Sequence, residues 1–342
     1  MFGTPATEAR RFSVAPMMNV TDRHCRYFLR LLTRRALLFT EMITSAALIR
    51  GGADWLLEFD PVEHPVALQL GGADPDELAR AAAMGEERGY DEVNLNVGCP
   101  SDRVKSGKFG ACLMAEPELV AASVKAMKAA VAVPVTVKCR IGIDDQDSEA
   151  DLSRFAKVVV DAGVDALYVH ARKAWLEGLS PAENRDIPPL DYPRVYRLKR
   201  ELAPLPVFIN GGVHSVIEAA AQLGHVDGVM MGRAAYQYPA TLLEVDRLFF
   251  GEARPPLSMA GIRDAMIEYA ERELKRGERL HRITRHLLGL ASSRPGARRF
   301  RQILTVESAQ RDAGPEVIER AFELIAEPAV QPFNSSPSLE TV

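Results

Sequence analysis

The stretch EVNLNVGCPSDRVKSGKFGACLMAEPELVAASVKAMKAAVAVPVTVKCRI (residues 92–141) contains two strand patterns with a helix pattern between them. Residues 92–97 and 134–141 are short, apolar and rich in valine, which is typical of buried strands. Residues 117–131 have the composition and apolar spacing of a helix, and Pro117 stands where the first helical turn tolerates a proline. Because parallel strands need a helical crossover, the stretch predicts a βαβ unit.

The same alternation extends in both directions along the 342-residue chain. Eight segments have strand patterns, and helix patterns separate them: 12–17, 37–42, 66–70, 92–97, 134–141, 166–172, 206–211 and 227–233. Eight parallel strands joined by helical crossovers close into a barrel of about 250 residues. Residues 11–251 therefore predict a TIM (β/α)8 barrel, which is an α/β fold.

The pattern changes after Gly251. A short linker, EARPP (252–256), is followed by a region with helix patterns alone, residues 258–327. This region predicts a small helical bundle as a second domain. The last residues, 328–342, are rich in serine and proline, and we expect them to be disordered.

The charge of the chain is unevenly distributed. The net charge is −4, but residues 272–301 hold ten Lys and Arg against two Glu, which makes this segment +8 and the remainder −12. Such a basic segment is typical of a surface that binds a polyanion such as RNA. A solvated helical face gives the same pattern, so charge alone leaves both interpretations open.

Polar side chains at the ends of the predicted strands indicate a site. Strands of a TIM barrel are apolar almost throughout, and side chains alternate between the two faces of a strand. The polar residues that share a face or end a strand are Gln69, Asn94, Asn96, Lys138, Arg140, Tyr168, His170, Arg172 and Asn210. They come from five strands, so we expect them to converge at the carboxyl ends of the strands, where TIM barrels hold their active sites.

Two glycine-containing loops indicate a phosphate. INGGV (209–213) and MGRA (231–234) follow the seventh and eighth strands, the loops that frequently bind phosphate in such barrels. Arg233 can add a charge-assisted hydrogen bond to a phosphate oxygen. A phosphate site together with Gln69 and Lys138 suits flavin mononucleotide (FMN), with Gln69 on the pyrimidine edge of the ring and Lys138 near N1 and O2. The backbone of Ala15, Pro16, Met17 and Met18 is expected to pack on the ring.

Other features limit the class of protein. The four cysteines form no CxxC pair and no His/Cys ligand spacing, and the sequence contains no long apolar run and no secretory signal. We therefore expect a cytoplasmic, reduced protein with no metal and no membrane partner, and we expect it to be a monomer. A Rossmann fingerprint is absent after the strands, so a nicotinamide is not held in the usual fold.

Several long motifs resemble the tRNA-dihydrouridine synthases. The resemblance covers residues 11 to 310 and is carried by APMMNVTDRHCR (15–26), ALQLGG (67–72), NLNVGCPSDRVKSGKFGACLM (94–114), VKCRIG (137–142), HARKAW (170–175), INGGV (209–213) and MGRAAYQ (231–237). Residues 170–196 resemble the A subfamily, which implies action at positions 20 and 20a of the tRNA D-loop. One departure is Ala182, where similar proteins often have a lysine.

The resemblance also implies roles for individual residues. It implies that FMN is held by Ala15–Met18, Gln69, Lys138, His170, Asn210, Gly211, Gly212, Gly232 and Arg233. It implies that Cys99 is the catalytic proton donor and that Asn96, Arg185, Arg298 and Arg301 contact tRNA. We expect NADPH to be the reductant, and residues 258–327 to form the tRNA-binding domain.

The chemistry of dihydrouridine formation agrees with a cysteine between Gly98 and Pro100. Reduction of the uracil 5,6 double bond adds hydride at C6, after which C5 needs a proton. Thiols are mostly protonated near neutral pH and can donate it. Asn96 and His170 are expected to hydrogen-bond the uracil edge, and Arg140 to stabilise the developing charge.

Two other functions use part of the same pattern. An FMN barrel that acts on a free dihydropyrimidine, similar to dihydroorotate dehydrogenase, has the flavin and the cysteine but no use for a basic bundle. A non-catalytic RNA-binding barrel has the basic bundle but no use for Cys99, Lys138 and a phosphate loop together.

Overall fold

The computed structural model describes residues 6–101 and 107–325. The expected disorder of residues 328–342 concerns positions outside this described part. The chain divides into two compact units, Met1–Pro256 and Leu257–Val342, and each unit is described by itself.

The first unit is a closed eight-stranded parallel barrel. The strands follow one another around the barrel in chain order, and the last pairs with the first. Their bounds are β1 (Phe12–Val14), β2 (Leu37–Thr44), β3 (Val66–Gly71), β4 (Glu92–Val97), β5 (Val135–Arg140), β6 (Ala166–His170), β7 (Val207–Asn210) and β8 (Gly228–Met231). The predicted TIM barrel is confirmed. Several strands are shorter than predicted, so Ala15–Met18 follow β1, and Arg172 lies beyond the end of β6.

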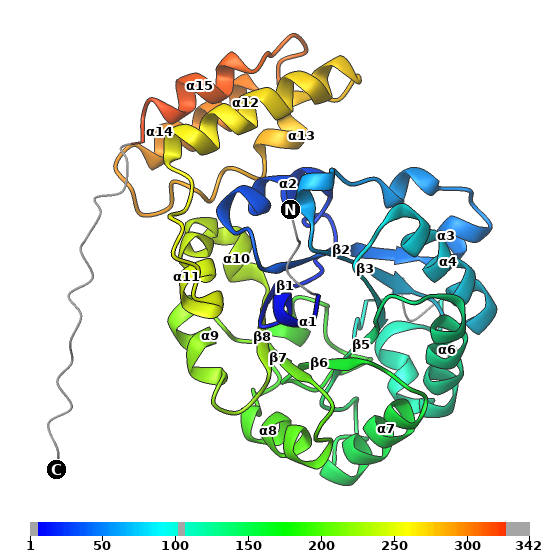
Figure 1. Cartoon of the computed structure of the whole chain (residues 1–342). Helices are drawn as coiled ribbons and strands as arrows, with labels where there is room; N and C mark the ends of the chain where they lie inside the picture. The colour runs from blue at the N-terminus through cyan, green and yellow to red at the C-terminus, as the bar shows by residue number, and fades with distance from the viewer. Residues whose placement is uncertain (1–5, 102–106, 326–342) are drawn as a thin grey trace, which may run out of the picture. The chain divides into compact units, whose positions relative to one another are not determined.

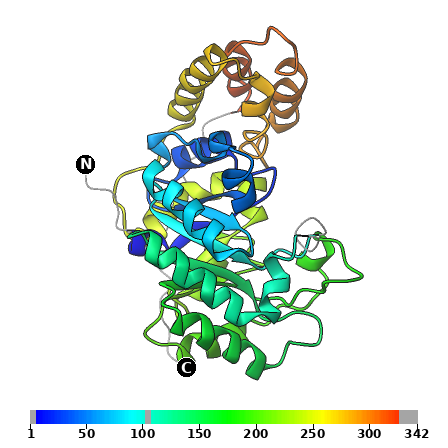
Figure 2. The same ribbon diagram turned by 90° about the vertical axis from the view of Figure 1, so that its right-hand side faces the viewer.

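Helices surround the barrel, with α4, α6 and α7 packed side by side on its outer surface (Figures 1 and 2). The helices of this unit are α1 (Ala6–Ala9), α2 (Arg23–Leu32), α3 (Ser45–Ile49), α4 (Pro75–Arg88), α6 (Pro117–Ala130), α7 (Glu149–Asp161), α8 (Tyr192–Glu201), α9 (Val216–Gln222), α10 (Arg233–Gln237) and α11 (Val245–Phe250). Local sequence sets their ends. The Asp74 side chain accepts the first N–H groups of α4, and Gly89 ends that helix in the left-handed conformation, at φ 94°.

The interior of the barrel changes from apolar to polar along the strands. Leu37, Phe39, Tyr168 and Phe208 belong to a buried apolar cluster inside the barrel. Toward the carboxyl ends of the strands, residues paired across neighbouring strands are polar: Gln69 with Asn94, Asn96 with Lys138, Arg140 with His170, and His170 with Asn210. Because paired residues in parallel strands point to the same face, this register brings the predicted polar side chains together at one end, which we call the mouth.

The second unit is helical, as predicted. It contains α12 (Met259–Lys275), α13 (Leu280–Thr284), α14 (Ala297–Gln302), a π-helical segment (Ile303–Glu307) and α15 (Glu316–Phe322) (Figure 1). Helix α12 packs against α15, and Phe300 of α14 meets the ring of Phe322 edge-on at 5.5 Å. Thr284 is fully buried, and its hydroxyl donates to the carbonyl of Leu304.

Two kinds of feature, a membrane-spanning helix and a metal-binding cluster, are absent from the described residues. None of their helices is long and apolar enough to cross a membrane. The same residues contain no cluster of three or more His, Cys, Asp or Glu side chains that would hold a metal ion.

Candidate active site

Cys99 lies on a loop that leaves β4 and is held from both sides. The Asn96 side-chain oxygen accepts the backbone N–H groups of Gly98 at 3.1 Å and Cys99 at 3.0 Å. The carbonyl of Cys99 accepts the N–H of Ala111 at 3.0 Å. The thiol is half-buried, and its Sγ lies 3.5 Å from Oγ of Ser101. The backbone around this cysteine is therefore fixed while its thiol remains accessible at the mouth.

Arg140 connects the Cys99 loop to the long loop after β6. Its Nε donates to the carbonyl of Gly98 at 2.9 Å, and its Nη1 donates to the carbonyls of Lys173 at 3.1 Å and Asn184 at 3.0 Å. Burial, opposed by Cys99 and assisted by the charges of Arg185 and Arg172, lowers the pKa of Arg140 to about 10. Arg140 thus positions two loops and brings a positive charge near Cys99.

Lys138 is a cation on which no acidic group acts among residues 6–101 and 107–325. It pairs in register with Asn96 on one side and Tyr168 on the other, which points it into the barrel. Burial, together with the charge of Arg140, lowers the pKa of Lys138 to about 8. The other ionisable groups that act on it are the thiols of Cys139 and Cys99, and no carboxylate is among them. An ammonium in such surroundings favours a bound anion.

His170 ends β6 beside Gly211. Burial lowers its pKa well below the usual value, and four cations, Arg140, Lys138, Arg172 and Arg185, contribute in the same direction. The ring is therefore neutral at pH 7. Its Nδ1 is buried and has no hydrogen-bond partner among the described residues. A buried polar atom of this kind needs a partner, and a ligand at the mouth is one way to supply it.

The loop after β7 needs its glycines. Gly211 and Gly212 both have positive φ, 106° and 66°. A Cβ on Gly211 would lie 3.1 Å from the His170 ring, and one on Gly212 would lie 2.3 Å from Leu190. Asn210 donates from its side chain to the carbonyl of Met230 at 2.7 Å, which joins the ends of β7 and β8. The backbone at this loop is therefore available for close approach by a ligand.

Arg233 forms an ion pair in this structure. Its guanidinium contacts both carboxylate oxygens of Asp186, at 2.5 Å and 3.1 Å, and about half of the arginine side chain is exposed. Arg233 also stands next to Gly232, directly after β8. The role of Arg233 at a phosphate stays a prediction. To bind Arg233, a phosphate would have to displace the Asp186 carboxylate from the guanidinium.

Gln69 and the segment after β1 occupy other parts of the mouth. Gln69 is buried, and its carboxamide is hydrogen-bonded on both sides, to Asn94 at 2.8 Å and to Asn96 at 2.8 Å. Ala15 is buried, whereas Met18 is 49% exposed and presents a large apolar side chain to solvent. An apolar side chain beside a polar interior is compatible with the expected packing of this segment on the planar ring of a flavin.

The predicted tRNA contacts lie in both units. Arg185 ends a short 3-10 helix (Glu183–Arg185), and partial burial together with the charge of Arg233 lowers its pKa. Arg298 and Arg301 are exposed on α14 of the helical unit, three residues apart on one helix. The structure thus brings Arg185 toward Cys99, Lys138 and His170, and places the other two arginines on the second unit.

Other residues at the mouth were not predicted. Asn184 is fully buried, and its side chain holds the backbone of Trp175, Leu179 and Ser180. Its carbonyl also accepts from Arg140, as described above. An asparagine in a polar loop gives no signal of this role, because its partners lie four to forty-four positions away in sequence.

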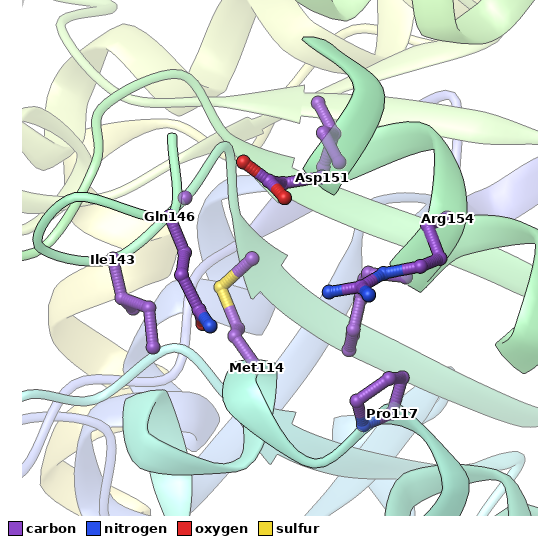
Figure 3. A pocket seen from close by; sticks show the side chains of 9 residues that line it. Met114, Pro117, Ile143, Gln146, Asp151 and Arg154 are labelled. Atoms are coloured by element: carbon purple, nitrogen blue, oxygen red, sulfur yellow. The ribbon is translucent and has the colours of Figure 1, made fainter. Parts of the chain in front are cut away.

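A small pocket lies elsewhere, outside the barrel. Its volume is about 10 Å³, and it is lined by Met114, Pro117, Ile143, Gln146 and Arg154 among others (Figure 3). This volume is at the lower limit for a single water molecule, so the pocket is no competitor to the mouth.

The arrangement at the mouth fits an anionic, phosphate-bearing cofactor. Within the described part of the chain, the fit rests on the unpartnered Nδ1 of His170, on the cation Lys138 with no acidic group acting on it, and on the paired glycines after β7. A half-buried thiol held at the same end of the barrel can supply a proton to a substrate beside that cofactor.

Comparisons with known proteins agree on one family. Residues 13–326 match the family described as dihydrouridine synthase (Dus). The tRNA-dihydrouridine(20/20a) synthase of Salmonella typhi is 56% identical over 323 residues, covering 94% of this chain and 97% of that protein. Proteins of the same name from Escherichia coli strain K12 and Vibrio cholerae are 56% and 54% identical, covering 93% of this chain in both cases and 92% and 98% of those proteins.

Solved structures share the fold. An old yellow enzyme homologue from Zymomonas mobilis has a TM-score of 0.52 at 14% identity, covering 72% of this chain and 89% of that chain. A 2-naphthoyl-CoA reductase complex has a TM-score of 0.51 at 14% identity, covering 69% of this chain and 49% of that chain. Likeness at this level of identity concerns the barrel alone.

Proposed function

The chain belongs to the dihydrouridine synthase family, and we propose that it reduces uridine to 5,6-dihydrouridine at positions 20 and 20a of the tRNA D-loop, with FMN as its flavin and NADPH as its electron donor. The support for the positions is the shared name of relatives that are 54–56% identical over more than nine-tenths of the chain. The single observation that carries the chemistry is the fixed Cys99 loop beside a cationic mouth.

The residues that would hold FMN come from five parts of the barrel. They are Ala15–Met18, Gln69, Lys138, His170 and the loops Asn210–Gly212 and Gly232–Arg233. Bound reduced FMN supplies a hydride equivalent to C6 of the uracil. Lys138 would stabilise negative charge on the pyrimidine edge of the flavin, and Arg233 would leave Asp186 to bind the phosphate.

Cys99 acts as the general acid. Its Sγ–H donates a proton to C5 of the uracil, and the negative charge passes to the sulfur. The positive charges of Arg140 and Arg185 act on this thiol, and they stabilise the thiolate that remains after the transfer. Arg140 has a second task, because its hydrogen bond to Gly98 keeps the loop in place.

Asn96 and His170 orient the reacting groups. In this structure the Asn96 carboxamide binds Gln69 and the backbone of the Cys99 loop, so its first role is to hold that loop. One Nδ2 hydrogen remains for the uracil edge. His170 is neutral at pH 7 and presents one donor and one acceptor, which suits either the cofactor or a carbonyl of the base.

The helical unit supplies affinity for tRNA. Its basic segment, residues 272–301, would bind phosphates, whose neutralisation dominates the affinity of most RNA-binding proteins. Arg298 and Arg301 on α14 would contribute such contacts, and Arg185 would meet the strand near the mouth. The target uridine has to leave its stack to reach the barrel, and enzymes that act on a base in RNA commonly use such extrusion.

One reaction tests the proposal. Unmodified tRNA transcript is incubated with the protein, FMN and NADPH, and its nucleotides are mapped by mass spectrometry. We expect a mass gain of two hydrogens at positions 20 and 20a. A transcript with cytidine at both positions is the matched control and should gain nothing there.

The free-dihydropyrimidine alternative is tested in parallel. Orotate, uracil and their dihydro forms replace the tRNA, and flavin oxidation is followed by absorbance. Turnover of a free pyrimidine without any product in tRNA would contradict the proposed function.

A further inference from the structure

A continuous ladder of hydrogen bonds crosses the barrel interior below the mouth. At its lower end, Arg10 donates from Nε to Oε2 of Glu92 at 2.6 Å. The Thr136 hydroxyl donates to the other oxygen of Glu92 at 2.5 Å. The Thr136 oxygen also accepts from Nδ2 of Asn94 at 2.8 Å.

The ladder continues from Asn94 to the Cys99 loop. Gln69 donates from Nε2 to Oδ1 of Asn94, and Asn96 donates from Nδ2 to Oε1 of Gln69, both at 2.8 Å. Oδ1 of Asn96 then accepts the backbone N–H of Cys99 at 3.0 Å. We call Glu92, Thr136, Asn94, Gln69 and Asn96 the interior ladder.

Backbone geometry explains why these side chains meet. Glu92, Asn94 and Asn96 alternate along β4, so all three point into the barrel. Asn94 is the register partner of Gln69 on β3 and of Thr136 on β5. Glu92, Thr136 and Asn94 are all 0% exposed, so none of the three reaches the surface of the mouth.

Every hydrogen bond of the interior ladder runs from donor to acceptor in the same sense, from Asn96 toward Glu92, and the Glu92 carboxylate determines this sense. Beside Arg10, the Glu92 carboxylate can only accept, so the Thr136 hydroxyl has to donate to it. Because the only hydrogen of the Thr136 hydroxyl is used, its oxygen can only accept from Asn94. Asn94 therefore has to turn its NH₂ group toward Thr136. The oxygen of Asn94 then faces Gln69.

The same direction passes to the mouth. Because Gln69 meets the Asn94 oxygen, it presents its NH₂ group there and its oxygen to Asn96. Asn96 donates to that oxygen and keeps its own oxygen for the N–H of Cys99. That N–H requires an acceptor, so the two ends of the ladder demand the same orientation of every carboxamide.

We propose that Glu92, Thr136 and Asn94 are positioning residues that fix the orientation of the Gln69 and Asn96 carboxamides, and through them the cofactor contact of Gln69 and the loop that carries Cys99. The inference rests on the proposed function for the roles of Gln69 and Cys99. Reversal of the ladder places the Asn96 NH₂ group against the N–H groups of Gly98 and Cys99, two donors facing donors, so the loop has to move.

Thr136→Val tests the ladder because it removes the hydroxyl while keeping the shape of the side chain. Two properties of the apoprotein are measured: the FMN dissociation constant by quenching of flavin fluorescence, and the rate of Cys99 alkylation by iodoacetamide, followed peptide by peptide. We expect FMN affinity to fall about tenfold, the size of one unsatisfied buried hydrogen-bonding group. We expect Cys99 to be alkylated several-fold faster because its loop is released.

Two variants make the result specific. Thr136→Ser keeps the hydroxyl and should restore both properties to within about twofold of wild type. Thr284→Val is the matched control, since Thr284 is also 0% exposed and also makes two side-chain hydrogen bonds, but in the helical unit. It should lower the melting temperature and leave FMN affinity and Cys99 alkylation unchanged.

The proposal is overturned if Thr136→Val leaves either property at its wild-type value, or if Thr136→Ser fails to restore it. If Thr136→Val does not fold, Asn94→Leu removes the middle of the ladder at similar volume and is subject to the same two measurements and the same criteria. Cys99 alkylation needs neither tRNA nor turnover. A wild-type protein that makes no dihydrouridine would therefore contradict the proposed function while the ladder is still tested.

Discussion

Cations at the two ends of the barrel interior, the buried Arg10 and the half-buried Lys138, have opposite surroundings. At the lower end, burial opposes the charge of Arg10, but Glu92 more than compensates and the pKa of Arg10 is raised. At the mouth, burial and the neighbouring charge of Arg140 together lower the pKa of Lys138 to about 8. Of these two cations, only Arg10 has a carboxylate partner among the described residues.

The difference indicates at which end the protein itself supplies the counter-charge. A buried ion pair is self-sufficient once its hydrogen bonds are made, whereas a cation held among other cations raises the free energy of the fold until an anion binds. We therefore expect the lower end to serve stability and the mouth to serve binding. This division agrees with the general placement of TIM-barrel sites at the carboxyl ends of the strands.

The largest effect is expected at the mouth, from Cys99→Ala. Removal of the general acid should slow dihydrouridine formation by about 10²–10⁴-fold, while NADPH still reduces the bound flavin. The rate of dihydrouridine formation is measured by single-turnover oxidation of the reduced flavin by tRNA. Reduction of the flavin by NADPH is measured by absorbance under anaerobic conditions. Cys112→Ala, at another half-buried cysteine, is the control. Wild-type turnover in Cys99→Ala would show that Cys99 is not the proton donor.

The next effect is expected at the lower end, from Arg10→Met. It leaves the Glu92 carboxylate buried without its cation, which should lower the free energy of unfolding by about 3–5 kcal/mol. Urea denaturation measures it. Arg35→Met breaks an exposed pair with Glu8 and should cost less than about 1 kcal/mol. Equal decreases in the free energy of unfolding of the two variants would show that the buried Arg10–Glu92 pair contributes no more stability than the Arg35–Glu8 pair.

A pH series on the apoprotein sharpens the comparison. The folded pKa of Lys138 is about 8 against an ordinary value of 10.5, so between these values the unfolded chain binds more protons and stability rises with pH. Wild type should therefore gain about 2 kcal/mol relative to Lys138→Met between pH 7 and pH 10, a value reduced for solvent screening.

Saturating FMN is the control for that series, because a bound anion restores the pKa of Lys138 and flattens the difference. Parallel curves for the two apoproteins would mean that Lys138 is not held among uncompensated cations.

The smallest effect is expected away from the barrel. Arg298→Ala with Arg301→Ala should weaken tRNA binding about tenfold and flatten its log–log salt dependence by about 0.7–0.9 for each phosphate that is no longer neutralised. Flavin reduction should not change. Arg263→Ala with Arg320→Ala removes the same charge from arginines already paired with Asp264 and Glu307, and serves as the control. A lower melting temperature with unchanged salt dependence would assign α14 to structure alone.

Much of the barrel could be predicted because its signals are local. Alternation within EVNLNV and VTVKCR identifies which residues share a face, and the order of strands in a (β/α)8 barrel follows from the chain itself. The register of Asn96 with Lys138 and of His170 with Asn210 is therefore a consequence of the fold, and the convergence of polar side chains could be expected from sequence.

The remaining parts of the site depend on interactions between distant segments. Thr136 looks like an ordinary strand residue, because threonine favours strands whether or not its hydroxyl is used. Asp186 lies 47 positions from Arg233, and no local pattern announces their pairing. Glu92 did leave a signal, since a glutamate at the start of a buried strand needs a partner, but nothing in the sequence identifies that partner as Arg10.

The central claim is that the mouth is built for an anionic flavin, and the most direct measurement is the affinity of the apoprotein for FMN. Wild type, Lys138→Met and the control Arg35→Met, at a half-buried arginine that precedes the start of β2, are each titrated and followed by flavin fluorescence. If Lys138 makes the proposed charge-assisted hydrogen bond to the flavin, Lys138→Met should weaken binding about tenfold or more, with Arg35→Met equal to wild type. Equal FMN affinity in wild type and Lys138→Met would contradict the account.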